Sequence, residues 1–170
     1  MLWQTIAYFL ILGIAFHWIG EALPRKWFLW NRFPYRPWRW ERQGRIYESL
    51  RIRAWKDRLP DKSRLIRGMV PKRVGICPTS ASVCRLIRET CVAEAVHAGL
   101  CLGALPLLLG VWGRASAWLA LAYVLGNLPF MMIQRYNRPA LVSLAERLKK
   151  REERRNGASA HSVGEYGGRT

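Results

Sequence analysis

The sequence predicts an all-α membrane protein with about three transmembrane helices and basic amphipathic helices at the membrane surface. Three mostly apolar stretches, 2–19, 90–112 and 115–133, are each close to the ~20 residues that an α-helix needs to cross a bilayer. The chain has 170 residues and a formal net charge of +17, and its 28 Lys and Arg residues lie almost entirely outside these stretches. This size and charge indicate one small membrane domain rather than an ordinary soluble one.

The distribution of the basic residues predicts the orientation of the helices. They lie between Arg25 and Arg88 and again from Arg135 onward, with Arg114 alone between the second and third apolar stretches. Cytoplasmic loops of membrane proteins carry an excess of Lys and Arg. We therefore expect the N-terminus outside the cytoplasm, the C-terminus inside it, and the second and third helices joined in a hairpin.

Residues 1–24 form the predicted N-terminal transmembrane anchor. Only Gln4 and His17 interrupt its apolar stretch. A secretory signal peptide is the alternative, but no basic residue precedes the stretch and no small-residue cleavage site follows it. We therefore expect the anchor to stay uncleaved.

Residues 25–78 form a basic, aromatic-rich segment on the cytoplasmic side. In the stretch 27–40, aromatic residues alternate with Arg and Pro, a composition found at membrane interfaces and in proteins that stack on single-stranded nucleic acid. The neighbouring apolar stretches favour membrane lipids as the partner of this stretch, and we expect it to bind no nucleic acid. Residues 41–59 carry apolar residues at three- and four-residue spacing among arginines, which predicts one amphipathic surface helix. Pro60 would end it, and 61–78 would form a basic loop.

Residues 79–155 form the predicted core, a helical hairpin followed by a basic helix. Thr79, Ser80 or Ser82 would cap its first helix, and Pro106 would kink that helix.

The end of the third apolar stretch predicts a new helix. Asn137 would cap it, with Pro139 in its first turn, and leucines at 141, 144 and 148 would form one apolar stripe. The Gly- and Ser-rich residues 156–170 are predicted to be a disordered tail.

Glu94 and His97 are ionisable residues inside the second apolar stretch, one helical turn apart on the same face. An ionisable group in hydrocarbon costs at least ~2.5 kcal/mol, so such residues usually face other helices or a wet cavity and carry a function. His97 is the candidate general base, and Glu94 the carboxylate that would hold its tautomer. The alternative is an interhelical hydrogen-bonding group of both residues with Asn127 that only joins the helices.

Further polar residues gather at the cytoplasmic end of these helices. Glu89 is the third acidic candidate for the catalytic site, expected at the membrane boundary and paired with Arg85 or with a residue near Arg135. The end of the third apolar stretch supplies groups that we expect to bind the substrates: Asn127, Gln134, Arg135, Tyr136, Asn137 and Arg138. The alternative is that its arginines only anchor the helix at the lipid headgroups.

The sequence does not predict a metal centre. The cysteines are spaced unlike zinc ligands, and we expect them to be reduced and unpaired: Cys77, Cys84, Cys91 and Cys101. Glu94 and His97 have the spacing of a di-iron ligand pair, but such centres need two copies and the chain has one. A membrane di-metal oxidase is therefore a distant alternative.

Three sequence blocks match a known family: WKDRLP at 55–60, ETCVAEAVH at 89–97 and NLPFMMIQRYNRPAL at 127–141. They resemble the glycosyl-diaponeurosporenoate acyltransferases, membrane enzymes that esterify the sugar of a carotenoid glycoside in staphyloxanthin synthesis. The resemblance implies a multi-pass enzyme of a bacterial cytoplasmic membrane that transfers a fatty acyl group to a sugar hydroxyl. The acyl donor would be acyl-CoA or an acyl carrier protein, with no cofactor. The first block adds Trp55, Lys56 and Asp57 to the expected substrate-binding residues.

The sequence leaves the acceptor and the assembly open. The family often has Trp where Ala98 follows His97, so a related glycolipid is an alternative to a glycosylated carotenoid as the lipid-soluble acceptor. The short chain also allows a non-catalytic membrane scaffold or lipid-binding subunit. An oligomer is possible.

Overall fold

The computed structural model describes residues 1–56 and 78–166, and this part of the chain consists of helices and connecting turns, with no strand. Three of its helices, α1, α5 and α7, are long and apolar enough to cross a membrane. The predicted all-α fold with three such helices is therefore confirmed for the described residues. In chain order the elements are α1 (Leu2–Ala22), η1 (Arg25–Trp27), η2 (Arg39–Gly44), α2 (Ile46–Ser49), α3 (Ile52–Trp55), α5 (Ser80–Gly103), α6 (Leu105–Leu108) and α7 (Arg114–Tyr166).

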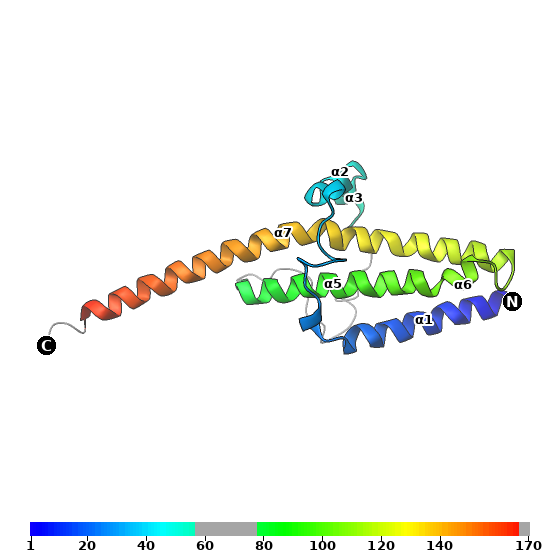
Figure 1. Ribbon diagram of the computed structural model, residues 1–170, viewed down its shortest axis with the longest axis horizontal. Helices are drawn as coiled ribbons and strands as arrows, with labels where there is room; N and C mark the ends of the chain where they lie inside the picture. Colours follow the sequence, from blue (N-terminus) through cyan, green and yellow to red (C-terminus); the bar gives the residue numbers. More distant parts are fainter. Residues whose placement is uncertain (57–77, 167–170) are drawn as a thin grey trace.

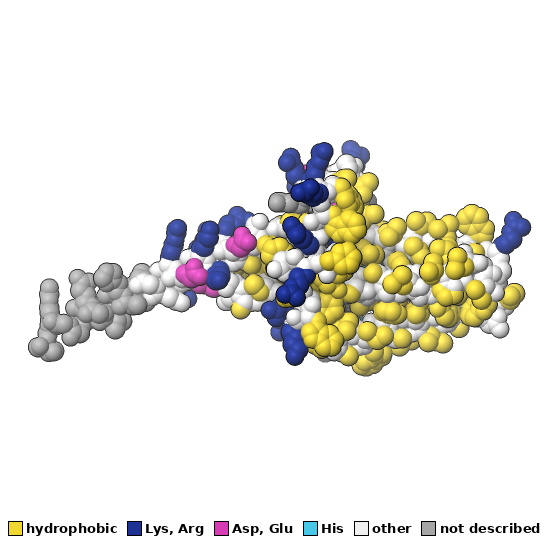
Figure 2. All heavy atoms as spheres, viewed as in Figure 1, with side chains coloured by type: hydrophobic (Ala, Val, Ile, Leu, Met, Phe, Trp, Pro, Cys, Tyr) yellow, Lys and Arg dark blue, Asp and Glu magenta, His cyan; other side chains and the backbone are white. Residues whose placement is uncertain are grey.

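Helix α5 lies between α1 and α7, and the three run side by side (Figure 1). Apolar side chains cover the half of the molecule around the N-terminus, and basic side chains gather around the other half (Figure 2). Large apolar side chains such as Trp18, Leu109 and Trp118 are exposed on the half around the N-terminus, as expected for a surface that faces lipid rather than water. The described part of the chain thus has one apolar half and one basic half.

Glycines bring α1 and α5 close together. A Cβ atom added at Gly99 would overlap the ring of Phe16, and one added at Gly103 would lie 2.8 Å from the Leu12 side chain. A Cβ atom added at Gly20 on α1 would lie 2.8 Å from the Val96 side chain on α5. Small residues at helix contacts of this kind let the backbones approach closely inside a membrane.

This close contact predicts the effect of a single methyl group. We expect Gly99→Ala to lower the free energy of unfolding in detergent micelles by ~1–3 kcal/mol, because the Phe16 ring must leave its place. Gly126→Ala is the matched control, since nothing lies within 4 Å of a Cβ at that position. Equal unfolding midpoints for the two variants would contradict the α1–α5 contact.

The start of α5 agrees with the predicted cap, whereas its end does not agree with the predicted kink. Thr79 is the N-cap, and its side chain and that of Ser82 accept each other's backbone N–H. The helix ends at Gly103, and Pro106 lies in the first turn of the short helix α6. A proline fits the first turn of a helix because the missing N–H is not needed there, so the chain breaks before Pro106 instead of bending at it.

Helix α7 is one continuous helix from Arg114 to Tyr166, so the prediction of a separate helix from Asn137 is wrong, while the disordered tail over 156–170 stays a prediction. The Asn137 side chain accepts a hydrogen bond from Lys56 at 3.4 Å and caps nothing. The predicted leucine stripe continues the helix because it packs against α5, on Val83 and Ile87. Beyond that contact each further residue adds a helical hydrogen bond without the cost of a new nucleus.

The predicted single amphipathic helix over 41–59 is also wrong. Its described part is divided into η2, α2 and α3, and three of its residues have positive φ: Arg42 (47°), Gly44 (89°) and Arg51 (51°). Gly44 fits against α7, because a Cβ there would lie 3.3 Å from the Tyr136 carbonyl oxygen. Ile52 is fully buried, so the segment folds onto the protein rather than lying flat on the membrane. The rest of the predicted helix and the loop to 77 lie outside the described residues.

Candidate active site

Four charged side chains meet where α5, α7 and η2 come together. Glu94 on α5 is 5 % exposed and accepts hydrogen bonds from Arg135 Nε at 2.7 Å and from Arg138 Nη2 at 2.5 Å. Arg135 Nη1 also donates to Glu41 Oε1 at 2.5 Å. Two arginines therefore face two glutamates. Such a balanced, hydrogen-bonded set is the form in which charges can be buried at acceptable cost.

Arg138 joins α7 to α5 from inside the protein. It is 2 % exposed, and its guanidinium donates to the Thr90 hydroxyl at 3.0 Å, to the Thr90 carbonyl at 3.3 Å and to the Tyr35 carbonyl at 2.8 Å. With Glu94, these acceptors surround the guanidinium on all of its nitrogens. Arg138, which we predicted to bind substrate, therefore binds groups of the protein.

Glu41 fixes the interfacial segment to this cluster. Its carboxylate is 2 % exposed and accepts from the Tyr47 hydroxyl at 2.8 Å and from the Trp38 backbone N–H at 2.9 Å, besides Arg135. Burial and the hydrogen bond to Glu41 raise the pKa of Tyr47, so this phenol stays a donor at all physiological pH values. Arg135 Nη2 adds a bond to the Pro34 carbonyl at 2.6 Å. We call the set Glu41, Glu94, Arg135 and Arg138 the ion cluster.

His97 lies one turn further along α5, on the membrane side of the ion cluster. Its Nδ1 is 2.8 Å from Asn127 Oδ1 on α7, and its ring stacks on Phe130 with centroids 4.8 Å apart. Asn127 Nδ2 donates to the Tyr123 carbonyl at 2.8 Å. A carbonyl can only accept, so the amide must present its oxygen to His97. The Nδ1 atom then carries the proton, and Nε2 is the basic nitrogen of the ring.

The described hydrogen bonds join Glu94 and His97 to different partners, and their predicted pairing stays a prediction. Glu94 is held by the two arginines, and Asn127 takes the place at the imidazole that was expected for the carboxylate. The two residues share a helix face, but α7 presents arginines to one and an amide to the other. The interhelical hydrogen bond to Asn127 that the alternative required is present for His97.

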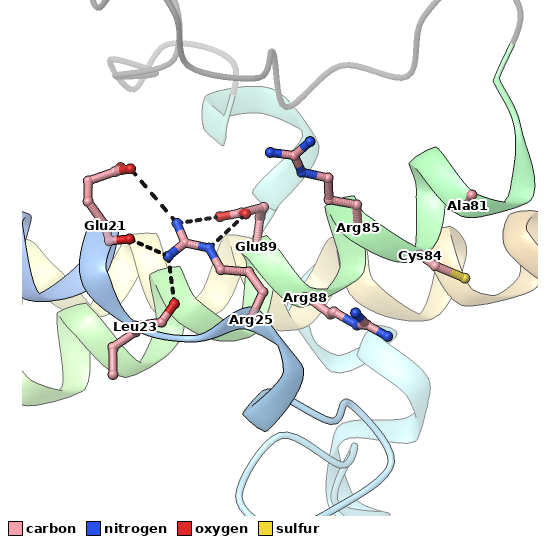
Figure 3. A pocket seen from close by; sticks show the side chains of 8 residues that line it. All are labelled: Glu21, Leu23, Arg25, Ala81, Cys84, Arg85, Arg88 and Glu89. Atoms are coloured by element: carbon pink, nitrogen blue, oxygen red, sulfur yellow. Dashed lines mark hydrogen bonds and ion pairs between the residues drawn. The ribbon is translucent and has the colours of Figure 1, made fainter.

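Glu89 has a different partner from the one that the sequence predicts. Its carboxylate pairs with Arg25, just beyond α1, with Nε at 3.0 Å and Nη2 at 3.3 Å. It lies on the wall of a cavity of about 720 Å³ between α1 and the first turns of α5 (Figure 3). Glu89 therefore lies with Arg25 at this cavity, and its predicted catalytic role stays a prediction.

The remaining predicted residues lie on α7 beyond Phe130 and in the segment that folds against it. Lys56 reaches Asn137 at 3.4 Å and lies over the Tyr136 ring, 5.2 Å from its centroid. Gln134 is buried, and Trp55 donates to the Leu50 carbonyl at 2.9 Å. The segment before residue 57 thus folds over α7. Asp57 lies outside the described residues.

Sequence reasoning missed Glu41 and the backbone acceptors around it. One signal was present, because Glu41 is the only acidic residue between Glu21 and Glu48 in a strongly basic stretch. An isolated carboxylate among arginines is a candidate for a buried ion pair.

Among the described residues, no three His, Cys, Asp or Glu side chains form a group that could hold a metal ion. Glu94 and His97, whose spacing suggested a di-metal centre, contact different groups: Glu94 binds arginines and His97 binds an amide.

Comparison with known proteins places this arrangement in context. A family model described as glycosyl-4,4'-diaponeurosporenoate acyltransferase matches residues 24–147. The chain is similar to the protein of that name from Staphylococcus aureus strain bovine RF122 / ET3-1, with 29 % identity over 150 residues, 86 % of this chain and 89 % of the relative. The corresponding protein of strain MRSA252 is 28 % identical over the same lengths. No solved structure matches the chain.

Proposed function

Because the chain belongs to the glycosyl-4,4'-diaponeurosporenoate acyltransferase family, we propose that it transfers a fatty acyl group to a sugar hydroxyl of a glycosylated carotenoid or a related glycolipid. The match confirms the resemblance drawn from the three sequence blocks, and it makes the chain an acyltransferase rather than a non-catalytic scaffold. We place the enzyme in a bacterial cytoplasmic membrane, as a multi-pass protein with its N-terminus outside and its C-terminus inside. The distribution of Lys and Arg supports this orientation.

The observation that carries the proposal is the His97–Asn127 pair inside the helical hairpin. Ester formation needs a base that takes the proton of the sugar hydroxyl, and a histidine held in one tautomer by an amide is suited to this role. His97 Nε2 accepts that proton while the hydroxyl oxygen attacks the acyl carbonyl carbon. The new C–O bond forms, the C–S bond of the donor thioester breaks, and the proton passes from Nε2 to the leaving thiolate.

The tetrahedral intermediate of this reaction carries an oxyanion that needs hydrogen-bond donors. A guanidinium has five N–H groups, and Arg135 directs three bonds to Glu94, Glu41 and Pro34. We assign its other N–H groups, with Gln134, to the acyl carbonyl or to the sugar. Arg135 is more exposed than Arg138, with 13 % against 2 % of the side chain, which favours it for contact with substrate.

The depth of the site suits two substrates of different polarity. His97 lies three residues beyond Glu94, or ~4.5 Å along the helix axis, on the side where the spans are apolar. An acyl chain and a carotenoid can lie in the hydrocarbon, while the sugar and the donor headgroup stay at the charged boundary. We propose an acyl-CoA or acyl carrier protein donor and no cofactor, because both donors are anionic and the surrounding surface is basic.

Product analysis tests this function directly. We expect expression of the chain in a host that makes a carotenoid-acid glucoside to yield a new fatty-acyl ester, detected by mass spectrometry of membrane extracts. The empty vector is the control. With the protein present in the membrane, absence of the ester would contradict the carotenoid acceptor, and a search of the same extracts for other acylated glycolipids would then test the alternative acceptor.

A further inference from the structure

The cavity between α1 and α5 is a second site, separate from His97. Its wall is formed by the end of α1, the residues that follow it and the first turns of α5: Glu21, Leu23, Arg25, Ala81, Cys84, Arg85, Arg88 and Glu89. At ~100° per residue, four of its α5 residues lie ~120–180° around the helix from His97, and Glu89 lies ~80° from it. The volume of about 720 Å³ is within the usual range of small-molecule sites.

From the elements that line it, we infer that the cavity lies at the level of the lipid headgroups. Its walls are the last turn of one membrane-spanning helix and the first turns of the next. Arg88 is the last basic residue before the long apolar run that ends at Arg114. A ligand in this cavity therefore sits where phosphate groups of a bilayer are found.

The charges of the cavity are only partly neutralised. Arg25 is fixed by Glu89 at 3.0 Å and by three backbone carbonyls at 2.8 Å, and it also lies 3.9 Å from Glu21 (Figure 3). Arg25 thus offsets the acidic groups. Arg85 and Arg88 are exposed and form no ion pair with any described residue. They extend from α5 on two sides of the cavity in Figure 3.

From these observations we propose that the cavity binds a phosphate-bearing anion between Arg85 and Arg88. Guanidinium groups bind phosphate through paired N–H donors, and basic pockets between transmembrane helices recognise anionic headgroups. Ala81 and Cys84 are small side chains on the same wall and leave room for the ligand. The phosphate can come from an anionic lipid of the surrounding leaflet or from a soluble molecule such as a coenzyme.

Binding to purified full-length protein distinguishes these sources. The protein is placed in nanodiscs of phosphatidylcholine, and phosphatidylglycerol or free coenzyme A is added in separate titrations, read by native mass spectrometry and by the shift in unfolding temperature. We expect one of the two probes to saturate at one site. Arg85→Gln and Arg88→Gln should each weaken that binding about fivefold, the effect of one basic residue near an anionic headgroup.

Two further variants separate the cavity from surface charge. Ala81→Leu fills the cavity without changing its charge and should also weaken binding, whereas Arg114→Gln removes an exposed charge from the start of α7, at the other end of the hairpin, and should leave it unchanged. Loss with the cavity variants alone supports the site and identifies its ligand by the probe that bound. Equal binding in all variants, or no saturable binding of either probe, would overturn it. The readout does not depend on acyl transfer, so it is independent of the proposed function.

Discussion

Replacing His97 by alanine is expected to reduce acyl-ester formation by about 10²- to 10⁴-fold, the usual contribution of a general base. The Nε2 atom that takes the hydroxyl proton is lost, while the remaining contacts of α5 with α7 and the ion cluster are kept. The measurement is the amount of ester per amount of membrane-inserted protein, by mass spectrometry and immunoblot.

His17→Ala is the matched control for this variant, because it removes a histidine from a membrane-spanning helix outside the proposed site. It should leave ester formation close to that of the wild type. Full activity of the His97 variant, with protein abundance unchanged, would exclude the base role and return the His97–Asn127 contact to a purely structural one.

The role of Asn127 as a positioning residue is separable from that of His97. Asn127→Leu removes the acceptor that fixes the proton on Nδ1, and the turnover rate should fall about tenfold, the value of one hydrogen bond of ~1.4 kcal/mol. Asn127→Asp keeps an oxygen at that place and should recover part of the rate. A change in KM alone would instead assign Asn127 to substrate binding.

Glu94→Gln is expected to destabilise the fold by ~3–5 kcal/mol, the typical cost of removing one partner from a buried ion pair. The variant keeps the shape of the side chain but leaves Arg138, which is 2 % exposed, with no carboxylate partner among the described residues. The free energy of unfolding is measured by denaturant titration in micelles, with helical circular dichroism as the signal.

Glu153→Gln is the matched control. Glu153 pairs with Lys149 at 3.9 Å on the exposed part of α7, and loss of such a surface pair costs about 0–1 kcal/mol. Equal destabilisation by the two substitutions would show that the ion cluster is not the main link between α5 and α7. Hydrogen exchange should also increase in residues 34–47 of the Glu94 variant, since Arg135 would lose one of the groups that position it against this segment.

The sequence predicts the three spans because each is a long apolar run with charge on its flanks, a signal carried by neighbouring residues. It also singles out Glu94 and His97, since ionisable residues are rare in such runs. It does not predict their partners. These depend on the rotation of α7, which places Arg135 and Arg138 at Glu94 and Asn127 at His97. The contacts that fix this rotation join residues 30 to 44 positions apart in the chain, so no local periodicity contains it.

The same dependence on residues distant in the chain explains why the structure of the segment 41–59 was not predicted. Apolar spacing over 41–59 is compatible with a surface helix, and only the approach of α7 at Gly44 and the burial of Glu41 divide it into short pieces. The continuous α7 has a related cause. The signals for a break at Asn137 and Pro139 are local, whereas the packing of the leucine stripe on Val83 and Ile87 is not.

The position of Glu41 has a consequence for the assembly of the protein during synthesis. The hairpin of α5 and α7 alone contributes two arginines and one glutamate to the ion cluster, so it carries one positive charge in excess. Glu41 supplies the missing negative charge from a segment that leaves the ribosome before the hairpin does. The segment that carries Glu41 is therefore made first, and the charges of the ion cluster balance only when α7 has inserted. A hairpin that inserts without this segment would keep one positive charge without its carboxylate partner.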